Sequence, residues 1–196
     1  MPKQSKTYIK ILEASLPLFA AFGYKGVAMR DIANTVGITA AALYNHFPNK
    51  ESLYFKALEY AFDAQVAGLA ETLANAKNPR QRLTVFIEFW VETFGSDVIL
   101  RALLQREMTD GDEARLKLLV RHVFFPVYEE IEGFMHSLAE RYDPLLLFFS
   151  MAGLVMYHFE TAPLRRLLPD FKPEHDNHEK IVEHVTTLMI GALGLH

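Results

Sequence analysis

Residues 29–50 constrain the fold of this chain more than any other segment, because two short helical patterns there are separated by a single glycine. Asp31 lies in the first turn of the first pattern, where a carboxylate interacts favourably with the positive end of a helix. Gly37 follows that pattern, and glycine enters the left-handed conformation of a helix C-cap without steric cost. Thr39 can accept a backbone hydrogen bond as the N-cap of the second helix. The segment therefore predicts a helix-turn-helix with a sharp turn at the glycine.

Each of the two predicted helices has one apolar face. The inward residues are Ile32, Ala33, Val36, Leu43 and Phe47. The outward face of the second helix is small and consists of Ala40, Ala41, Tyr44 and Asn45. Because there is so little bulk near its start, such a helix can lie deep in the major groove of double-stranded DNA.

This segment resembles the N-terminal domain of the TetR family of transcriptional regulators. The shared pattern consists of Asp31-Ile32-Ala33, Gly37-Ile38-Thr39, Leu43-Tyr44, His46-Phe47 and Lys50. Further upstream, the positions of the family's first helix and closing turn are occupied by Leu12, Leu18, Phe19 and Gly23-Tyr24. The resemblance covers about the first quarter of the chain. It implies a dimeric DNA-binding regulator, a repressor that binds a palindromic operator.

The resemblance also implies which residues contact the operator. The base-reading residues would be Arg30, Ala40, Ala41 and Tyr44, and the phosphate contacts would be Thr39, Tyr44, Asn45, His46 and Lys50. Elementary chemistry agrees, since an arginine can bind the O6 and N7 atoms of guanine and an alanine can contact only thymine methyl groups. Two alternatives stay open: Tyr44 as a packing residue, and His46 as a group that stabilises the helix C-terminus.

Two positions depart from the family pattern. Ala28 stands where the family usually has a threonine or serine that caps the first of these helices. A cap worth about 1 kcal/mol is therefore lost or supplied by another group. Ala40 stands where a basic or polar residue is frequent, so base reading is expected to depend on Arg30, on methyl contacts and on DNA shape.

The composition favours a folded protein with a basic N-terminal end. Hydrophobic residues make up 51% of the chain and charged residues 22%, which excludes a disordered chain. Residues 1–50 carry a net charge of +4 and the remainder −8, which suits a DNA contact confined to one end. The absence of cysteine favours a reducing cytoplasm. Glu13 interrupts the first apolar stretch, and the longest uncharged run, Pro144 to Phe159, is too short to span a membrane.

Helical periodicity predicts an all-α chain of about nine helices, without strands or repeats. We expect residues 1–48 to form a helix-turn-helix DNA-binding domain, and residues 49–196 to form a helical bundle for ligand binding and dimerisation. The first helix should bend or break at Pro17, and a long helix over residues 112–141 should kink at Pro126. Asn49, Asp143 and Asn177 mark helix starts, and the prolines between residues 163 and 173 indicate a loop.

The last two predicted helices, over residues 144–161 and 177–195, indicate how the chain assembles. The residues from Leu145 to Tyr157 are apolar on nearly every side. Such a helix is either the core of one monomer or is covered by a second copy, and the two are compatible. We favour a homodimer in which these helices form a four-helix bundle, because one short recognition helix reads too few bases alone. The resemblance implies the same arrangement.

The resemblance also places a small-molecule effector in the C-terminal bundle. Its pocket would be lined by aromatic and apolar residues, with two histidines as polar groups: Phe86, Phe89, Trp90, His122, Phe125, Tyr128, Met151, Tyr157 and His158. The alternative is that these aromatics are plain core. A hydrophobic or aromatic effector would release the operator by favouring a dimer geometry that no longer matches it.

Two other classes of function are possible for an all-α chain of this kind. An enzyme or metal-binding bundle finds no support, because the chain has no Glu-x-x-His pair, phosphate loop or His-Glu-x-x-His motif, so no catalytic residue, metal or cofactor is expected. His175, His178 and His184 lie near glutamates but are interpreted as solvated. The other alternative is a ligand-binding bundle or adaptor without DNA-binding activity, which binding without salt dependence would indicate.

Overall fold

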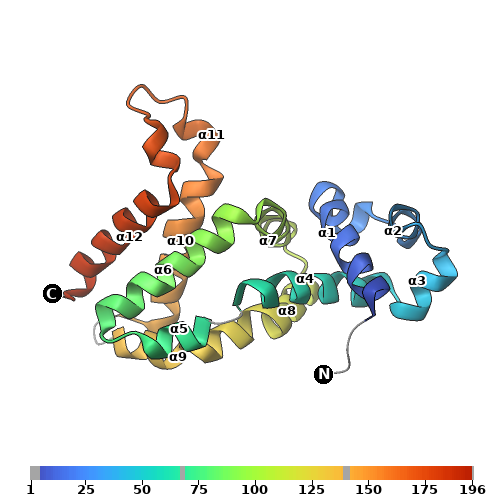
Figure 1. The fold of residues 1–196 in the computed structure, drawn as a ribbon, viewed down its shortest axis with the longest axis horizontal. Coiled ribbons are helices and arrows are strands. Elements are labelled where there is room, and N and C mark those ends of the chain that lie inside the picture. The colour runs from blue at the N-terminus through green and yellow to red at the C-terminus, as the bar shows by residue number, and fades with distance from the viewer. Residues whose placement is uncertain (1–4, 67–68, 139–141, 196) are drawn as a thin grey trace. The chain divides into compact units, whose positions relative to one another are not determined.

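The computed structural model describes residues 5–66, 69–138 and 142–195, and all regular structure in these ranges is helical (Figure 1). The predicted all-α fold is confirmed. The chain forms two compact units, and each contains segments from distant parts of the sequence. We call the first the head unit (residues up to Ala64, and Val98–Pro126) and the second the body unit (Gln65–Asp97, and the residues from Val127).

The head unit is built around its first helix. Its helices are α1 (Lys6–Gly26), α2 (Met29–Val36), α3 (Ala40–His46), α4 (Lys50–Val66), α7 (Val98–Asp110) and α8 (Glu113–Leu119), with a π-helical turn η1 (Val120–Phe124). α1 packs against both α2 and α7, α2 packs against α3, and α7 packs against α8 (Figure 1). The fully buried side chains in this core include Ile11, Phe19, Ile32, Leu43 and Leu53.

The body unit is centred on α6. Its helices are α5 (Leu69–Asn75), α6 (Pro79–Ser96), α9 (Phe125–Leu138), α10 (Pro144–Glu160), α11 (Ala162–Arg165) and α12 (His178–Leu193), with a 3₁₀ turn η2 (Pro173–Asp176). α5, α10 and α12 all pack on α6, and α10 also packs on α12 (Figure 1). Phe86, Ile87 and Trp90 of α6 are therefore completely buried.

α10 is apolar on two opposite sides. Leu147, Phe148, Met151 and Val155 are buried, while other large apolar residues of the same helix remain exposed: Leu145, Leu146, Phe149, Leu154 and Tyr157. Within one chain, then, only one face of this helix is covered. Among the described residues, no helix combines the length and apolar character that crossing a membrane requires.

The described residues contain twelve α-helices, compared with about nine predicted. The helix predicted to start at Asn49 corresponds to α4 and α5, with residues 67 and 68 outside the described ranges. The predicted helix over residues 112–141 is divided by η1 directly before Pro126. Proline lacks an N–H group, and at this turn the Phe125 N–H donates to the carbonyl of Val120, five residues back. α11 is an additional turn in the predicted loop.

The interruption of α1 lies at Gly23, not at Pro17. Helical backbone continues through Pro17, whereas Gly23 has φ 71° and ψ 169°. Residues with a side chain are strained in this conformation, and a Cβ atom on Gly23 would also come within 3.0 Å of the Arg106 guanidinium. The predicted break at Pro17 is therefore wrong.

Side-chain caps fix the starts of several helices where the sequence predicts them. Asn49 Oδ1 accepts a hydrogen bond from the Ser52 N–H at 2.7 Å, and Asp143 Oδ1 accepts one from the Leu146 N–H at 2.9 Å. Asn177 caps α12 in the same way. Each bond satisfies a backbone donor that the first helical turn leaves unpaired, so these predicted helix starts are confirmed.

Candidate nucleic-acid interface

The turn between α2 and α3 has the conformation predicted for it. Gly37 has φ 78° and ψ 36°, and its N–H donates to the carbonyls of Ala33 and Asn34 at 3.0 and 3.1 Å. The Ile38 N–H also donates to the Ala33 carbonyl, at 3.0 Å. These bonds form a Schellman motif, which ends α2 and directs the chain into α3. The predicted helix-turn-helix is therefore present.

Replacing Gly37 with alanine should lower the free energy of unfolding by about 1–2 kcal/mol. A Cβ atom at this position meets no other atom within 4 Å, so the cost comes only from the left-handed backbone. Gly37→Asn is the matched control, because asparagine adopts this conformation more readily and should cost less. Urea unfolding measures both values. Equal stabilities for wild type and Gly37→Ala would contradict the role of this turn.

α2 begins without the hydroxyl cap that is usual at this position. Ala28 has no side-chain acceptor, but Asp31 Oδ2 accepts a hydrogen bond from the Ala28 N–H at 3.1 Å. The hydrogen bond that a hydroxyl at residue 28 would accept from α2 is therefore absent, while the reciprocal bond of a capping box is present, and the Asp31 carboxylate also suits the helix dipole. Arg30, the second residue of α2, is exposed and therefore accessible to a nucleic acid.

α3 presents the small outward face that the sequence predicts. Thr39 Oγ1 accepts a hydrogen bond from the Ala42 N–H at 3.1 Å, which confirms the predicted N-cap. Leu43 is fully buried, and the helix therefore turns Ala41, Tyr44 and Asn45 to the surface. The Tyr44 side chain is 51% exposed. A packing role for Tyr44 within the chain is therefore not supported.

The remaining predicted contact residues on α3 are less accessible. Ala40 and His46 are half-buried. The His46 ring lies edge-on to the Tyr8 ring, with 6.4 Å between the centroids, and Tyr8 also stacks on Phe47 at 4.8 Å. These contacts attach the end of α3 to α1, so His46 has a packing partner inside the head unit.

Two lysines of the basic N-terminal segment hold helix ends in place. Lys50 Nζ donates to the carbonyls of Tyr24 and Val27, at 2.8 and 3.0 Å. Lys10 Nζ donates to the carbonyl of Val36, the last residue of α2, at 2.9 Å. Sequence reasoning did not identify this role, because the acceptors are backbone atoms that no residue type marks.

The predicted effector residues divide between the two units. His122 and Phe125 belong to the head unit, where His122 Nδ1 lies 2.7 Å from Glu59 Oε1 and Phe125 is 50% exposed. The other seven belong to the body unit. Of these, Phe86, Trp90 and Met151 are fully buried, whereas Tyr157 is 65% exposed.

The buried aromatics of the body unit form one packed cluster. Phe148 lies at its centre, with ring centroids 6.2 Å from Phe86, 5.9 Å from Trp90 and 5.8 Å from Tyr128. Trp90 also lies 5.2 Å from Phe89. The structure therefore brings Phe86, Trp90 and Tyr128 together around Phe148, a residue that sequence reasoning did not select, and Phe89 joins this cluster through Trp90.

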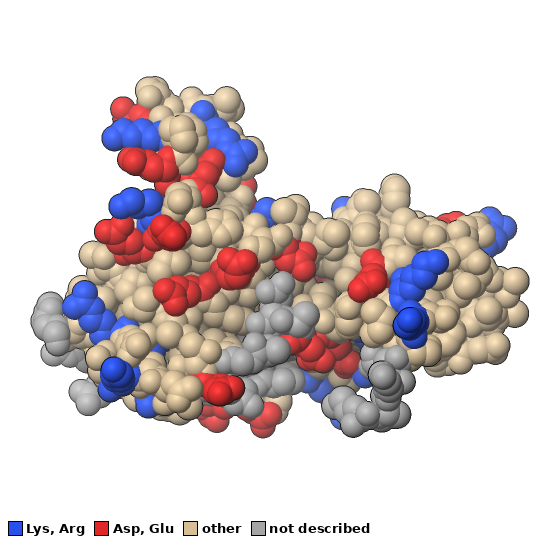
Figure 2. Space-filling model, viewed as in Figure 1, with Lys and Arg blue, Asp and Glu red and all other residues tan. Residues whose placement is uncertain are grey.

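An open hollow of about 590 Å³ lies among α10, α11, η2 and α12. Arg165 donates to Asp176 Oδ1 at 2.7 Å and to the His158 carbonyl at 2.9 Å, and the His158 and His184 rings meet edge to face at 5.7 Å. Figure 2 shows side chains of both charges gathered around α11 and η2. The hollow is lined by His158, Arg165, Glu174, His175, Lys180, Ile181, Glu183, His184 and Thr187. Only His158 is among the predicted ligand residues.

His158 should make the stability of the body unit depend on pH. Burial lowers the pKa of its imidazole below the usual 6.5, and Arg165 and His184 lower it further. The unfolded chain therefore takes up a proton more readily, so the free energy of unfolding falls as the pH drops below about 6.5. Urea unfolding at about pH 7.5 and about pH 5.5 should show a smaller fall for His158→Gln than for wild type. An identical fall would contradict this assignment.

A metal centre has no support in the part of the chain that the structure describes. In these residues, no three or more histidine, aspartate or glutamate side chains are grouped so that they could hold a metal ion. His178, one of the three histidines noted in the sequence, instead lies edge-on to Phe159 with ring centroids 5.5 Å apart.

Comparison with known proteins agrees with the helix-turn-helix geometry. Residues 11–57 match the family described as bacterial regulatory proteins, tetR family. The biofilm operon icaADBC HTH-type negative transcriptional regulator IcaR of Staphylococcus epidermidis is 41% identical over 148 residues. That alignment covers 69% of this chain and 69% of the relative.

Solved structures share the whole fold at lower sequence identity. FadR from Bacillus subtilis in complex with stearoyl-CoA gives a TM-score of 0.76 at 15% identity, covering 93% of this chain and 97% of that one. AibR in complex with isovaleryl coenzyme A and operator DNA gives 0.68 at 22% identity, with the same coverage of 93% and 97%. The resemblance seen in the sequence is confirmed, and the chain belongs to the TetR family of bacterial regulatory proteins.

Proposed function

We propose that this protein is a transcriptional repressor that binds a palindromic operator as a homodimer and releases it when a small hydrophobic effector binds. The observation that carries the proposal is the exposed face of α3, set against α2 by the Gly37 turn. Tyr44 extends from that face, and the alanines beside it let α3 approach base edges closely, while Arg30 is exposed near the start of α2. The relative named as a negative transcriptional regulator supports repression as the direction of control.

The contact residues divide by chemistry. We assign base reading to Arg30, Ala40, Ala41 and Tyr44, and phosphate contacts to Thr39, Tyr44, Asn45, His46 and Lys50. Lys50 has three N–H donors, two of which bind carbonyls, so the third can donate to a phosphate oxygen. The exposed hydroxyl of Tyr44 can reach a base or a phosphate.

The exposed faces of α10 and α12 support dimerisation through these helices. Phe149 and Leu154 of α10 and Leu188 of α12 are large apolar residues that a single chain leaves exposed. A Cβ atom added at Gly153 or Gly191 would meet nothing within 4 Å, so a partner helix can approach both positions closely. Several large apolar side chains exposed on two packed helices are typical of a protein interface.

We place the effector in residues 49–196, together with dimerisation, and DNA binding in residues 1–48. The two solved structures of this fold carry stearoyl-CoA and isovaleryl coenzyme A, ligands that join an acyl chain to a polar group. They support a hydrophobic effector here, and half-buried Phe89, Tyr128 and His158 are the predicted ligand residues of the body unit that are neither fully buried nor, like Tyr157, largely exposed. Such a protein acts in the cytoplasm and regulates rather than catalyses.

A gel-shift experiment on the DNA upstream of its own gene tests this proposal. Wild type should form a specific complex that weakens as salt increases, because phosphate contacts release counterions. Arg30→Ala should bind about 10- to 100-fold more weakly and discriminate less at one base pair. Lys50→Ala should weaken binding to all sequences alike. The proposal is wrong if no specific, salt-sensitive shift appears and both variants behave like wild type.

A further inference from the structure

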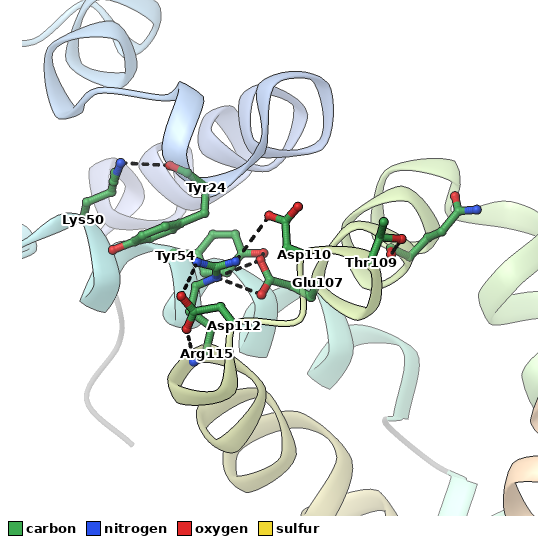
Figure 3. Close-up of polar contacts among 9 residues, drawn as sticks. Tyr24, Lys50, Tyr54, Glu107, Thr109, Asp110, Asp112 and Arg115 are labelled. Atoms are coloured by element: carbon green, nitrogen blue, oxygen red, sulfur yellow. Dashed lines mark hydrogen bonds and ion pairs between the residues drawn. The ribbon is translucent and has the colours of Figure 1, made fainter.

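A buried carboxylate on α7 connects three helices of the head unit. Glu107 is 1% exposed, and its Oε1 atom accepts a hydrogen bond from the Tyr54 hydroxyl of α4 at 2.7 Å (Figure 3). Arg115 Nε of α8 donates to both Glu107 oxygens, at 2.9 and 3.2 Å. Arg115 is itself only 4% exposed. A buried ion pair with every partner in place has few alternative geometries, so it fixes α4, α7 and α8 to one another.

The turn between α7 and α8 completes the surroundings of Arg115. Its guanidinium also lies 3.3 Å from Asp110 and 3.2 Å from Asp112, on either side of Gly111. Asp112 Oδ1 accepts a hydrogen bond from the Arg115 N–H and so caps α8. The arginine is therefore held in place from both ends of the turn.

The same arginine contacts the segment that leads into α2. Its guanidinium carbon lies 5.0 Å from the centre of the Tyr24 ring, and Lys50 Nζ lies 4.5 Å from that centre (Figure 3). Lys50 also donates to the carbonyls of Tyr24 and Val27. Val27 is two residues before the start of α2, so a continuous series of contacts runs from Glu107 to the first helix of the DNA-reading pair.

We propose that Glu107 is a positioning residue for DNA binding, which acts through Arg115, Tyr24 and Lys50 to hold α2 and α3 in the orientation that reads DNA. This inference rests on the proposed function. It makes the α7–α8 turn a part of the DNA-binding machinery, although that turn lies more than fifty residues beyond α3 in the sequence. Stability alone does not account for this buried charge, because apolar residues often stabilise a comparable site at least as well.

The chemistry of Tyr54 suits a permanent donor to this carboxylate. Burial, and then the hydrogen bond to Glu107, raise the pKa of the Tyr54 hydroxyl far above its usual range. The hydroxyl therefore stays protonated wherever the protein is folded. Removing this hydroxyl disturbs the carboxylate while leaving the ion pair with Arg115 and the aromatic packing of Tyr54 on Phe19, at 4.7 Å between centroids, in place.

Tyr54→Phe is the most informative variant, and Tyr60→Phe is its matched control. Tyr60 is on the same helix and also donates to a glutamate, Glu13 Oε1, at 2.9 Å, and none of the polar or ring contacts among the described residues joins it to Glu107, Arg115 or Tyr24. Tyr54→Phe should bind the upstream fragment measurably more weakly, by up to about tenfold, because the loss of one hydrogen bond to a charged group limits how much orientation it can cost. Tyr60→Phe should bind like wild type. Glu107→Gln should weaken binding further.

Two readouts separate positioning from plain stability. The dependence of affinity on salt should be the same for Tyr54→Phe as for wild type, because no phosphate contact is removed. Hydrogen exchange should become faster over residues 24–37 in Tyr54→Phe but not in Tyr60→Phe. If Glu107→Gln does not fold, Tyr54→Phe decides the question alone.

The inference is overturned if folded Tyr54→Phe binds with wild-type affinity, or if exchange over residues 24–37 is unchanged. A change in salt dependence would also overturn it, since that would indicate a lost phosphate contact. These failures differ from failure of the proposed function, in which wild type itself binds no specific DNA.

Discussion

Phe149→Glu on α10 and Leu188→Glu on α12 are each expected to convert the proposed homodimer into a monomer and to weaken operator binding at least about a hundredfold. Both side chains are more than half exposed in a single chain, at 55% and 51%. In the dimer they would be buried, and a glutamate there would lose its hydration without gaining a partner. A monomer also has only one helix-turn-helix, whereas a palindromic operator has two half-sites. Sedimentation velocity and gel shift measure the two effects.

Leu167→Glu is the control for this pair. Leu167 is 83% exposed but lies between α11 and η2, outside the two helices of the proposed interface. It should leave both the oligomeric state and the DNA affinity unchanged. Circular dichroism would verify that all three variants are helical. Dimeric Phe149→Glu and Leu188→Glu proteins would show that the interface is elsewhere.

Trp90→Ala is expected to lower the free energy of unfolding by about 3–5 kcal/mol. Trp90 is 1% exposed and stacks on Phe94 with 4.9 Å between ring centroids. Truncation would leave a cavity that this tightly packed cluster cannot fill. Urea unfolding followed by circular dichroism measures the change, since Trp90 is the single tryptophan of the chain and its fluorescence would be lost.

The size of this loss distinguishes a core residue from one that lines an effector pocket. Trp90→Phe is the control and should cost less, because it keeps a ring and removes an indole N–H for which the described residues provide no acceptor. A loss below about 1 kcal/mol for Trp90→Ala would mean that the side chain already borders open space and would favour the pocket.

The helix-turn-helix could be predicted because its signals are local. The conformation at Gly37 and the caps at Thr39, Asn49 and Asp143 each depend on residues within four positions of one another. A residue type is enough to predict such a bond, because only a few side chains can make it. The outward position of Tyr44 followed from helical periodicity in the same way.

The network around Glu107 could not be predicted, since its members are far apart in sequence. Tyr54 and Glu107 are separated by 53 positions, and nothing in their neighbours marks them as partners. The same is true of Lys50, whose acceptors are backbone carbonyls on α1 and in the turn that follows it. The charge of Lys50 could be recognised from the sequence, but its location over the Tyr24 ring could not.

The sequence could not show which of the predicted effector residues are core and which line a pocket, for a related reason. Helical spacing shows that Phe86, Trp90 and Tyr157 are apolar positions of helices, but it does not show what lies opposite each face. The structure buries Phe86 and Trp90 and leaves Tyr157 exposed on α10. Tertiary packing decides whether such a residue is buried in the core or exposed on the helix surface.

Hydroxyl-radical footprinting of wild-type protein on the DNA upstream of its gene decides whether this chain binds an operator as a symmetric dimer. We expect two protected segments related by two-fold symmetry, with centres separated by about one helical turn, roughly 10 base pairs, or a multiple of it. Such a pattern requires both a DNA-binding face on α3 and a symmetric dimer with two head units. Protection that is absent, lacks this symmetry or occurs equally on unrelated DNA would contradict the account.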